Sequence, residues 1–178
     1  IDRENKIGYI RLSSFNRTSA KEMDYAMREM VRKHGIKGFV LDLRFNPGGL
    51  LDVAIKITDL YVDDGLIVSI HPRGGPGRAA RYFGRHQESL LEFPMVCLVN
   101  GYSASGSEIV SAALQDHKRA VIIGERSYGK GSVQNIRAFE VVDPKSGDVK
   151  MAGIKLTTAS FWRPSGKNLN KASTPGQE

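Results

Sequence analysis

The sequence predicts an α/β fold: a layered core with a mostly parallel sheet flanked by helices, followed by long C-terminal β-strands. Three observations support this prediction. Short, continuous apolar runs are typical of strands that are covered on both faces. Segments whose apolar residues recur every three or four positions follow these runs and indicate helices. Repeated strand-then-helix units favour parallel strands, and the 178 residues suit a single domain spanning 1–178.

The first half of the chain predicts two strands and two helices. Residues 7–12 alternate apolar and other side chains, which indicates a strand. A helix capped by Thr18 or Ser19 is expected through about residue 33. Its buried stripe consists of Met23, Ala26, Met27, Met30 and Val31. A buried strand at 38–43 and a helix at about 51–61 complete this half.

The second half predicts one more helix and several strands. Residues 103–116 are expected to form the helix, with Ile109, Val110, Ala113 and Leu114 facing inward. The strand and helix alternation stops after residue 131, beyond which a turn at 143–147 joins two long strands. The expected strands are 66–70 and 78–83, paired as a hairpin, then 94–99 and 120–124, both buried, and finally 133–142 and 149–161.

The net charge of +7 is spread along the chain. The densest basic stretch is interpreted as a solvated β-hairpin, because no recognised nucleic-acid-binding motif accompanies it, and we therefore expect no nucleic-acid partner. The stretch contains Arg73, Arg78, Arg81, Arg85 and His86. The longest apolar runs, 39–43 and 95–99, are far shorter than the roughly 18 residues that span a bilayer.

Cysteine and histidine usage argues against a metal centre. Cys97, the single cysteine, lies in an apolar run, so we expect a buried and inert thiol. The histidines lie far apart in the sequence, and no cysteine–histidine cluster has metal-ligand spacing. Dinucleotide-binding and phosphate-binding glycine motifs are absent. We therefore expect neither a bound metal nor an organic cofactor.

The segment 99–109 is the most informative for function. A buried strand ends, small residues make a tight turn, and a helix begins. Such a turn exposes a side chain at the carboxyl edge of a sheet, and helix N-terminal amides favour developing negative charge. Ser105 is therefore suited to attack a carbonyl group. The same residues also fit a capping box from Ser105 to Glu108, and Ser103 fits the N-cap equally well.

A serine nucleophile needs a general base. His117 lies about three helical turns from Ser105, roughly 18 Å away, which is too far for a hydrogen bond. Lysine is the other option, because desolvation lowers the pKa of a lysine and lets it accept a proton near neutral pH. Lys130 lies between two glycines just past a predicted strand, although a surface lysine in a turn fits the pattern as well.

Three blocks of sequence together resemble the carboxyl-terminal processing peptidases, or tail-specific proteases. They are residues 41–50, 99–109 and 114–134, whose order and spacing match the family. The resemblance extends from Gly8 to about Thr174. It implies a serine endopeptidase that cleaves proteins near their C-terminus through a serine–lysine dyad and an acyl-enzyme. It also implies a core architecture similar to that of Clp proteases and crotonases.

The resemblance assigns catalytic roles to individual residues. The family's nucleophile corresponds to Ser105, the middle serine of its block. The general base corresponds to Lys130, 25 positions later. Gln134 corresponds to a glutamine that helps hold the lysine side chain in some members. No metal or organic cofactor takes part in this chemistry.

The resemblance also implies an oxyanion hole and supporting residues. One amide is expected from Gly106 and the other from Gly48 or Gly49, and the resemblance does not settle which. Gly106 departs from the family's usual alanine, and glycine loosens the turn by adding backbone freedom. Asp116 and Arg44 are expected supporting residues, and Asp116 closes the helix that carries the candidate nucleophile.

Family members usually carry a PDZ domain before the segment that starts near Ile7, and further chain after about residue 176. Ile1 is not a usual initiator residue, so we expect this chain to be a catalytic core without those parts. The PDZ domain docks a substrate C-terminus by strand addition. By the same resemblance we expect a protein or peptide substrate, a periplasmic or other extracytoplasmic location, and a homo-oligomer as one option for the full-length protein.

Two other interpretations stay open from the sequence. A crotonase-like enzyme shares the layered architecture, but it binds an acyl-CoA thioester and needs no serine–lysine pair. A non-catalytic module binds peptides or nucleic acid through the basic stretch 73–86. Labelling by a serine-directed acylating reagent, saturable CoA-ester binding and a salt-dependent gel shift distinguish the three.

Overall fold

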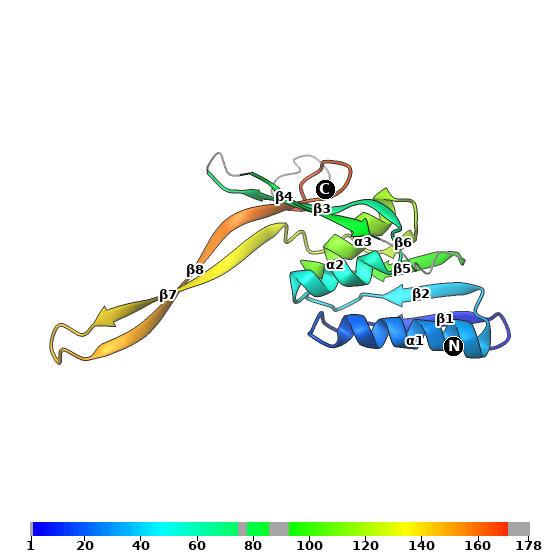
Figure 1. Cartoon of the computed structure of the whole chain (residues 1–178), viewed down its shortest axis with the longest axis horizontal. Coiled ribbons are helices and arrows are strands. Elements are labelled where there is room, and N and C mark those ends of the chain that lie inside the picture. Colours follow the sequence, from blue (N-terminus) through cyan, green and yellow to red (C-terminus); the bar gives the residue numbers. More distant parts are fainter. Residues whose placement is uncertain (1, 75–77, 86–92, 171–178) are drawn as a thin grey trace.

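The computed structural model describes residues 2–74, 78–85 and 93–170. Figure 1 shows a layered α/β body from which a long two-stranded ribbon projects. The fold class predicted from the sequence is confirmed, because a parallel sheet, an antiparallel sheet and helices are all present. Within the described residues, no helix is long and apolar enough to cross a membrane.

The parallel sheet has the strand order β1-β2-β5-β6. Its members are β1 (Ile7–Arg11), β2 (Gly38–Asp42), β5 (Met95–Val99) and β6 (Val121–Gly124). Each neighbouring pair is parallel, as the strand and helix alternation predicts. Asp42 pairs with Leu98 in register, so the carboxyl ends of the two central strands lie side by side.

The strand predicted at 120–124 is present as β6, but the prediction that it is buried is wrong. Among the described strands, β6 borders only β5, so it forms an edge of the sheet. Val121 is 63% exposed and Ile123 is 49% exposed. An apolar run indicates a strand, but it does not reveal whether other elements cover both faces of that strand. Cys97, in the central strand β5, is buried as predicted, and burial raises the pKa of its thiol to about 12.

In the part of the chain that the structure describes, three helices connect and cover the strands: α1 (Ser19–His34), α2 (Leu51–Asp59) and α3 (Gly106–Asp116). Thr18 is the N-cap residue of α1, and Gly35 ends this helix with a φ of 55°. The three methionines of its predicted stripe are buried, whereas Ala26 and Val31 are half-buried. α3 begins at Gly106, three residues later than predicted, because the preceding residues form a separate turn.

The antiparallel sheet has the strand order β4-β3-β8-β7. Its members are β3 (Asp64–Pro72), β4 (Ala80–Arg85), β7 (Ser132–Val142) and β8 (Val149–Trp162). The hairpin predicted over the basic stretch is present as β3 and β4, while His86 lies outside the described residues. The two long C-terminal strands are also confirmed, and they pair with each other from Ser132 and Ser160 to Val142 and Val149.

α2 and α3 lie between the two sheets and pack against both of them. Toward the parallel sheet, Val110 and Leu114 of α3 join the larger core cluster. Toward the antiparallel sheet, Ile109 and Ala113 of α3 pack with Ile67 of β3. All four inward-facing residues predicted for this helix are therefore buried, two in each of the two hydrophobic clusters.

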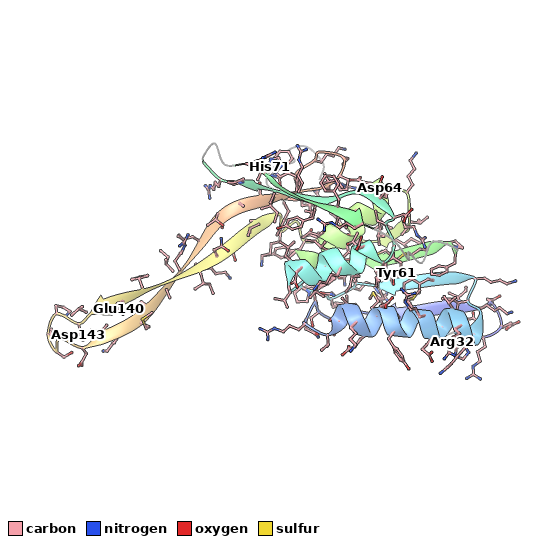
Figure 2. The ribbon with its side chains drawn as sticks, in the orientation of Figure 1. Arg32, Tyr61, Asp64, His71, Glu140 and Asp143 are labelled. Carbon is pink, nitrogen blue, oxygen red and sulfur yellow. The ribbon has the colours of Figure 1, made fainter. Side chains whose placement is uncertain are left out.

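The ribbon consists of the parts of β7 and β8 that extend beyond the body, residues 133–158. β3 borders β8 from Ala159 to Trp162, and among the described residues neither long strand pairs with another strand farther out. Glu140 and Asp143 lie near its far end (Figure 2). Its exposed large apolar residues are Ile136, Phe139, Val141, Val142, Val149, Met151, Ile154 and Leu156.

Candidate active site

Ser105 lies between β5 and α3 and is the N-cap residue of α3. Its φ of 55° places it in the left-handed region, which a non-glycine residue occupies at an energetic cost. Such strain persists only where surrounding contacts hold the backbone, and it clusters at functional sites. Because Ser105 follows β5 and directly precedes α3, its predicted position between a strand and a helix is confirmed.

The residues from 100 to 105 form a tight turn, called here the serine turn. The capping box predicted from Ser105 to Glu108 is present, and the Glu108 carboxylate accepts a hydrogen bond from the Ser105 amide at 2.8 Å. Ser103 is not the N-cap residue. Its buried hydroxyl donates to the Leu43 carbonyl oxygen at 2.8 Å and accepts from the Asn100 amide at 2.9 Å. Ser103 thereby ties the serine turn to the end of β2.

The residues from 46 to 49 form a second turn, the glycine turn, which packs directly against the serine turn. The carbonyl oxygen of the buried Asn46 accepts from the Ala104 amide at 3.0 Å and from the Ser107 hydroxyl at 2.9 Å. Its side chain accepts from the Gly48 amide at 2.8 Å and donates to the Leu12 carbonyl oxygen at 2.8 Å. Asn46 therefore fixes the glycine turn against residues on both sides of the candidate nucleophile.

Both glycines of this turn lie so close to other parts of the chain that a side chain would not fit. Gly48 has a φ of 100° and Gly49 a φ of 151°. A Cβ atom on Gly48 would lie 2.8 Å from the Ser105 Cβ and 2.9 Å from the Gly106 nitrogen. A Cβ atom on Gly49 would lie 2.2 Å from the Phe15 carbonyl oxygen. Contacts this short leave no room for a side chain, so glycine at position 48 lets the glycine turn approach the serine turn, and glycine at position 49 lets it approach Phe15.

Phe15 links the glycine turn to the start of α3, a role that sequence reasoning missed. Its amide donates to the Gly48 carbonyl oxygen at 3.0 Å, and its carbonyl oxygen accepts from the Leu50 amide at 2.8 Å. Its ring packs against Gly106, where an added Cβ atom would lie 3.1 Å from the ring. This tight contact explains why glycine fits at position 106. A single apolar residue in a loop carries no sequence signal of such a role.

Glu108 holds the backbone on both sides of the candidate serine–lysine dyad. It is 3% exposed, and one carboxylate oxygen accepts from the amides of Ser105, at 2.8 Å, and Lys130, at 2.9 Å. The other oxygen accepts from the Gly129 amide at 2.6 Å and the Ser127 hydroxyl at 2.7 Å. Two amides on one oxygen place the backbones of Ser105 and Lys130 within about 6 Å of each other. The sequence pattern indicated only the capping contact with Ser105, and not the contacts with Ser127, Gly129 and Lys130.

Lys130 is half-buried and flanked by two glycines. Gly129 has a φ of 86°, and a Cβ atom on Gly131 would lie 2.1 Å from the Asn170 backbone nitrogen. The prediction that these glycines let the backbone pass close to another part of the chain is therefore confirmed. Four residues beyond Lys130, Gln134 pairs with Thr157 in the antiparallel sheet, and its side chain is exposed.

Asp42 and Arg44 form an ion pair at the end of β2. The buried Asp42 carboxylate accepts from the Arg44 guanidinium at 2.8 and 3.0 Å and from the Arg44 amide at 3.0 Å. The Tyr9 hydroxyl donates to the same carboxylate at 2.7 Å. The Arg44 hydrogen bonds are the largest cause that lowers the pKa of Asp42, to about 2. The pair fixes the backbone that leads into the glycine turn.

Asp116 ends α3, far along the helix from Ser105. Its carboxylate accepts from the Arg163 guanidinium at 2.6 and 2.9 Å and from the Ser165 amide at 3.0 Å. Burial tends to raise the pKa of this carboxyl, but the hydrogen bonds from Arg163 and Ser165 outweigh burial and hold it below its usual value. Asp116 thus connects the helix that begins at Ser105 with the chain that follows β8.

The remaining candidate groups lie elsewhere. His117 Nε2 is 2.7 Å from the Leu66 carbonyl oxygen of β3, in agreement with the exclusion of His117 as the general base. In the parts of the chain that the structure describes, no three His, Cys, Asp or Glu side chains gather where a metal ion could bind. The arrangement therefore offers a strained serine, a nearby lysine and the N-terminus of α3 beside the serine. These groups suit acyl transfer, because helix N-terminal amides stabilise developing negative charge.

Comparisons with known proteins agree with this chemistry. A family model described as "Peptidase family S41" matches residues 6–176. The carboxy-terminal-processing protease of Bartonella bacilliformis is 41% identical over 169 residues, which cover 93% of this chain and 37% of the relative. The carboxyl-terminal-processing protease of a Synechocystis species is 38% identical and covers 93% of this chain and 36% of the relative. The chain thus spans less than two fifths of the length of these relatives.

Solved structures give the same result. A protein described as the photosystem II D1 C-terminal processing protease superposes with a TM-score of 0.76 at 33% identity. The match covers 96% of this chain and 41% of that one. A lipoprotein from Streptococcus agalactiae, at 16% identity and a TM-score of 0.66, shares the fold.

Proposed function

This chain belongs to peptidase family S41, and we propose that it is the catalytic core of a serine endopeptidase that cleaves proteins near their C-terminus. The relatives named as carboxyl-terminal processing proteases support this substrate class. Family membership favours the peptidase over the acyl-CoA enzyme and the non-catalytic module that the sequence left open. The observation that carries the proposal is the Glu108 carboxylate, which binds the backbones of both Ser105 and Lys130.

In the proposed mechanism, neutral Lys130 accepts the proton of the Ser105 hydroxyl as Oγ attacks the peptide carbonyl carbon. The tetrahedral intermediate collapses, the C–N bond breaks, and the leaving amine takes the proton from Lys130. Water then attacks the acyl-enzyme with Lys130 again as the base, and Ser105 is released with its proton restored. Gln134 orients the Lys130 side chain, and Asp116 and Arg44 stabilise the elements that carry the site.

The proposed oxyanion hole consists of the Gly106 amide and the Gly49 amide. Gly106 is the first residue of α3, so its N–H has no carbonyl partner within the helix. The Gly48 amide already donates to the Asn46 side chain, which favours Gly49 as the second donor. In the parallel bridge between Phe15 and Gly49, the donors are Phe15 and Leu50, so the Gly49 amide is not used there. Gly106 begins α3 and Gly49 lies in the glycine turn, and the contacts of Phe15 with both residues hold the two amides in fixed positions, as stabilisation of developing charge requires.

We also propose that the protein acts outside the cytoplasm, in the periplasm or cell envelope. Its relatives include bacterial processing proteases and a processing peptidase of Arabidopsis thaliana described as chloroplastic. Cell fractionation measures this location directly. Homo-oligomerisation of the full-length protein stays a prediction, which sedimentation velocity measures.

The test of the dyad uses Ser105→Ala and Lys130→Ala in the full-length protein. Each change is expected to lower kcat/KM for a protein with an unstructured C-terminal tail by at least about 1,000-fold, because the nucleophile or its base is lost. Ser13→Ala and Lys21→Ala, at exposed positions, are matched controls that should keep wild-type rates. Cleavage by Ser105→Ala or Lys130→Ala at the wild-type rate would falsify the proposed dyad.

A further inference from the structure

Two exposed aromatic side chains stack on each other beside the serine turn. The ring centroids of Phe45 and Tyr102 are 5.4 Å apart, and the ring planes differ by 22°. Phe45 is 58% exposed and Tyr102 is 68% exposed. Large aromatic side chains that stay in solvent at the rim of a site are typical of binding surfaces, because a ligand that covers them removes apolar area from water.

A single buried side chain holds both aromatic residues in place. The Asn100 side-chain oxygen accepts from the Phe45 amide at 3.0 Å and from the Tyr102 amide at 3.2 Å. Asn100 is itself 8% exposed. Phe45 has a φ of 63°, which is unfavourable for a bulky residue. The contact with buried Asn100 maintains this strained backbone at the edge of the site. Such strain indicates a functional constraint on the position of the Phe45 ring.

The stacked pair lies on the two turns that meet at Ser105. Tyr102 precedes Ser105 by three residues in the serine turn, and Phe45 precedes Gly48 by three residues at the entry to the glycine turn. Three residues of chain span at most about 11 Å. An extended peptide that passes over Ser105 therefore brings side chains within about three residues of the cleaved bond into reach of the rings.

We infer that Phe45 and Tyr102 form a subsite for one large apolar or aromatic side chain of the substrate, within about three residues of the cleaved bond. The inference rests on the proposed peptidase function and adds a specificity determinant to it. The rings bind such a side chain by burial of apolar area and by offset stacking. A serine or glycine at the same substrate position gains neither contribution.

The charged neighbours of the pair do not select a charged occupant. Arg44 precedes Phe45, and its guanidinium is bound to the Asp42 carboxylate. On the other side, the Glu125 carboxylate accepts from the Gly101 amide, next to Tyr102, at 3.4 Å. Arg44 and Glu125 carry opposite charges, and each is bound to a group outside the aromatic pair, so the pair offers exposed apolar area to a substrate.

The test measures kcat/KM of the full-length protein on internally quenched peptides. The peptides carry phenylalanine, leucine, lysine or serine at one of three positions on either side of the cleaved bond. At one position the wild type is expected to prefer phenylalanine and leucine over serine. Tyr102→Ala and Phe45→Ala are expected to lower kcat/KM about 3- to 10-fold for those two peptides, mainly through KM. The serine peptide should change less than twofold.

Two further variants serve as controls. Tyr102→Phe keeps the ring and should keep the preference. Tyr25→Ala removes a tyrosine on α1 that is 67% exposed, close to the exposure of Tyr102, and should leave every rate unchanged. An equal loss on all peptides, or no loss on any, overturns the subsite. A preference for lysine at this position also overturns it, because the occupant is then a cation.

Ser105→Ala separates this inference from the proposed function. If Ser105→Ala cleaves as fast as the wild type, the peptidase proposal fails. If cleavage depends on Ser105 but Tyr102→Ala leaves the selectivity unchanged, only the subsite fails. Isothermal titration of the same peptides into Ser105→Ala gives Kd values without turnover. The preference for phenylalanine over serine should disappear when Tyr102→Ala is added, and an unchanged preference overturns the subsite.

Discussion

The strained backbone of Ser105 and the buried carboxylate of Glu108 depend on each other. A left-handed serine is unfavourable by itself, and the Glu108 side chain compensates by accepting from its amide. The same carboxylate accepts from Lys130, Gly129 and Ser127. Glu108 is therefore a positioning residue for both members of the candidate dyad.

We predict that Glu108→Gln lowers kcat at least about tenfold while KM changes less than twofold, because small displacements of reacting groups are costly. A glutamine amide replaces one acceptor oxygen with a donor, so at least one of the four converging donors loses its partner. The free energy of unfolding should fall by about 1–3 kcal/mol. Steady-state kinetics and urea unfolding measure the two effects. Glu22→Gln, exposed on α1, is the control, and an unchanged kcat for Glu108→Gln contradicts the role.

We predict that Asp42 contributes to acid stability. Its pKa is lowered to about 2, mainly by Arg44, so its contribution is fully present above the ordinary carboxyl pKa near 4 and is lost as the pH falls toward 2. The contribution is at most about 2 kcal/mol, because Arg44 is half-exposed and solvent screens the pair.

The measurement is the urea midpoint between pH 6 and pH 2. Asp42→Asn should lower the midpoint at pH 6 and should show a flatter decline than the wild type between pH 4 and pH 2. Asp52→Asn, at an exposed position, serves as the control and should follow the wild-type curve. An equally steep decline in Asp42→Asn rules out the proposed contribution.

At the scale of elements, β7 and β8 differ from every other strand pair. They stabilise each other by pairing from Ser132 and Ser160 out to Val142 and Val149, but only their base touches β3. Both strands carry apolar residues at many positions, a pattern that core strands share. In this structure the apolar side chains of the ribbon remain in solvent, so the same pattern contributes little burial.

We predict that Ile136→Thr in this isolated chain changes the free energy of unfolding by less than about 0.5 kcal/mol, because Ile136 is 73% exposed. Ile67→Thr is the matched control in β3, where the side chain is fully buried, and it should cost at least about 2 kcal/mol. Chemical denaturation of both variants measures the difference. A large cost for Ile136→Thr means that another surface covers the ribbon.

At the scale of the whole molecule, ion pairs and turns join layers that are far apart in the sequence. Asp116 at the end of α3 binds Arg163 beyond β8, so the helix that starts at Ser105 is anchored at both ends. The glycine turn after β2 and the serine turn after β5 meet because those strands are adjacent and parallel. The candidate site therefore lies where the carboxyl ends of neighbouring strands converge, as is usual for α/β proteins.

Much of this arrangement could be predicted from the sequence. Apolar periodicity places the helices and most strands correctly, and the strand–turn–helix pattern places Ser105 in the turn before α3. The errors share one cause. The run at 120–124 is apolar yet lies at a sheet edge, and the helix expected from residue 103 begins at Gly106, because Ser103 belongs to a turn and bonds to Leu43. Local pattern reports what a segment can form, and it does not report which neighbours cover it.

The α/β class and the order of the elements follow from the sequence alone, because periodicity and turn chemistry are local properties, whereas the catalytic roles predicted for Ser105 and Lys130 come from the family resemblance. Only the tertiary structure decided that Glu108 binds both Ser105 and Lys130, that Phe15 joins the glycine turn to α3, and that Phe45 stacks on Tyr102. Apart from the capping contact between Glu108 and Ser105, each of these contacts joins parts of the chain that are distant in sequence. Strand order and layer packing create such contacts, and a single sequence carries no local signal for them.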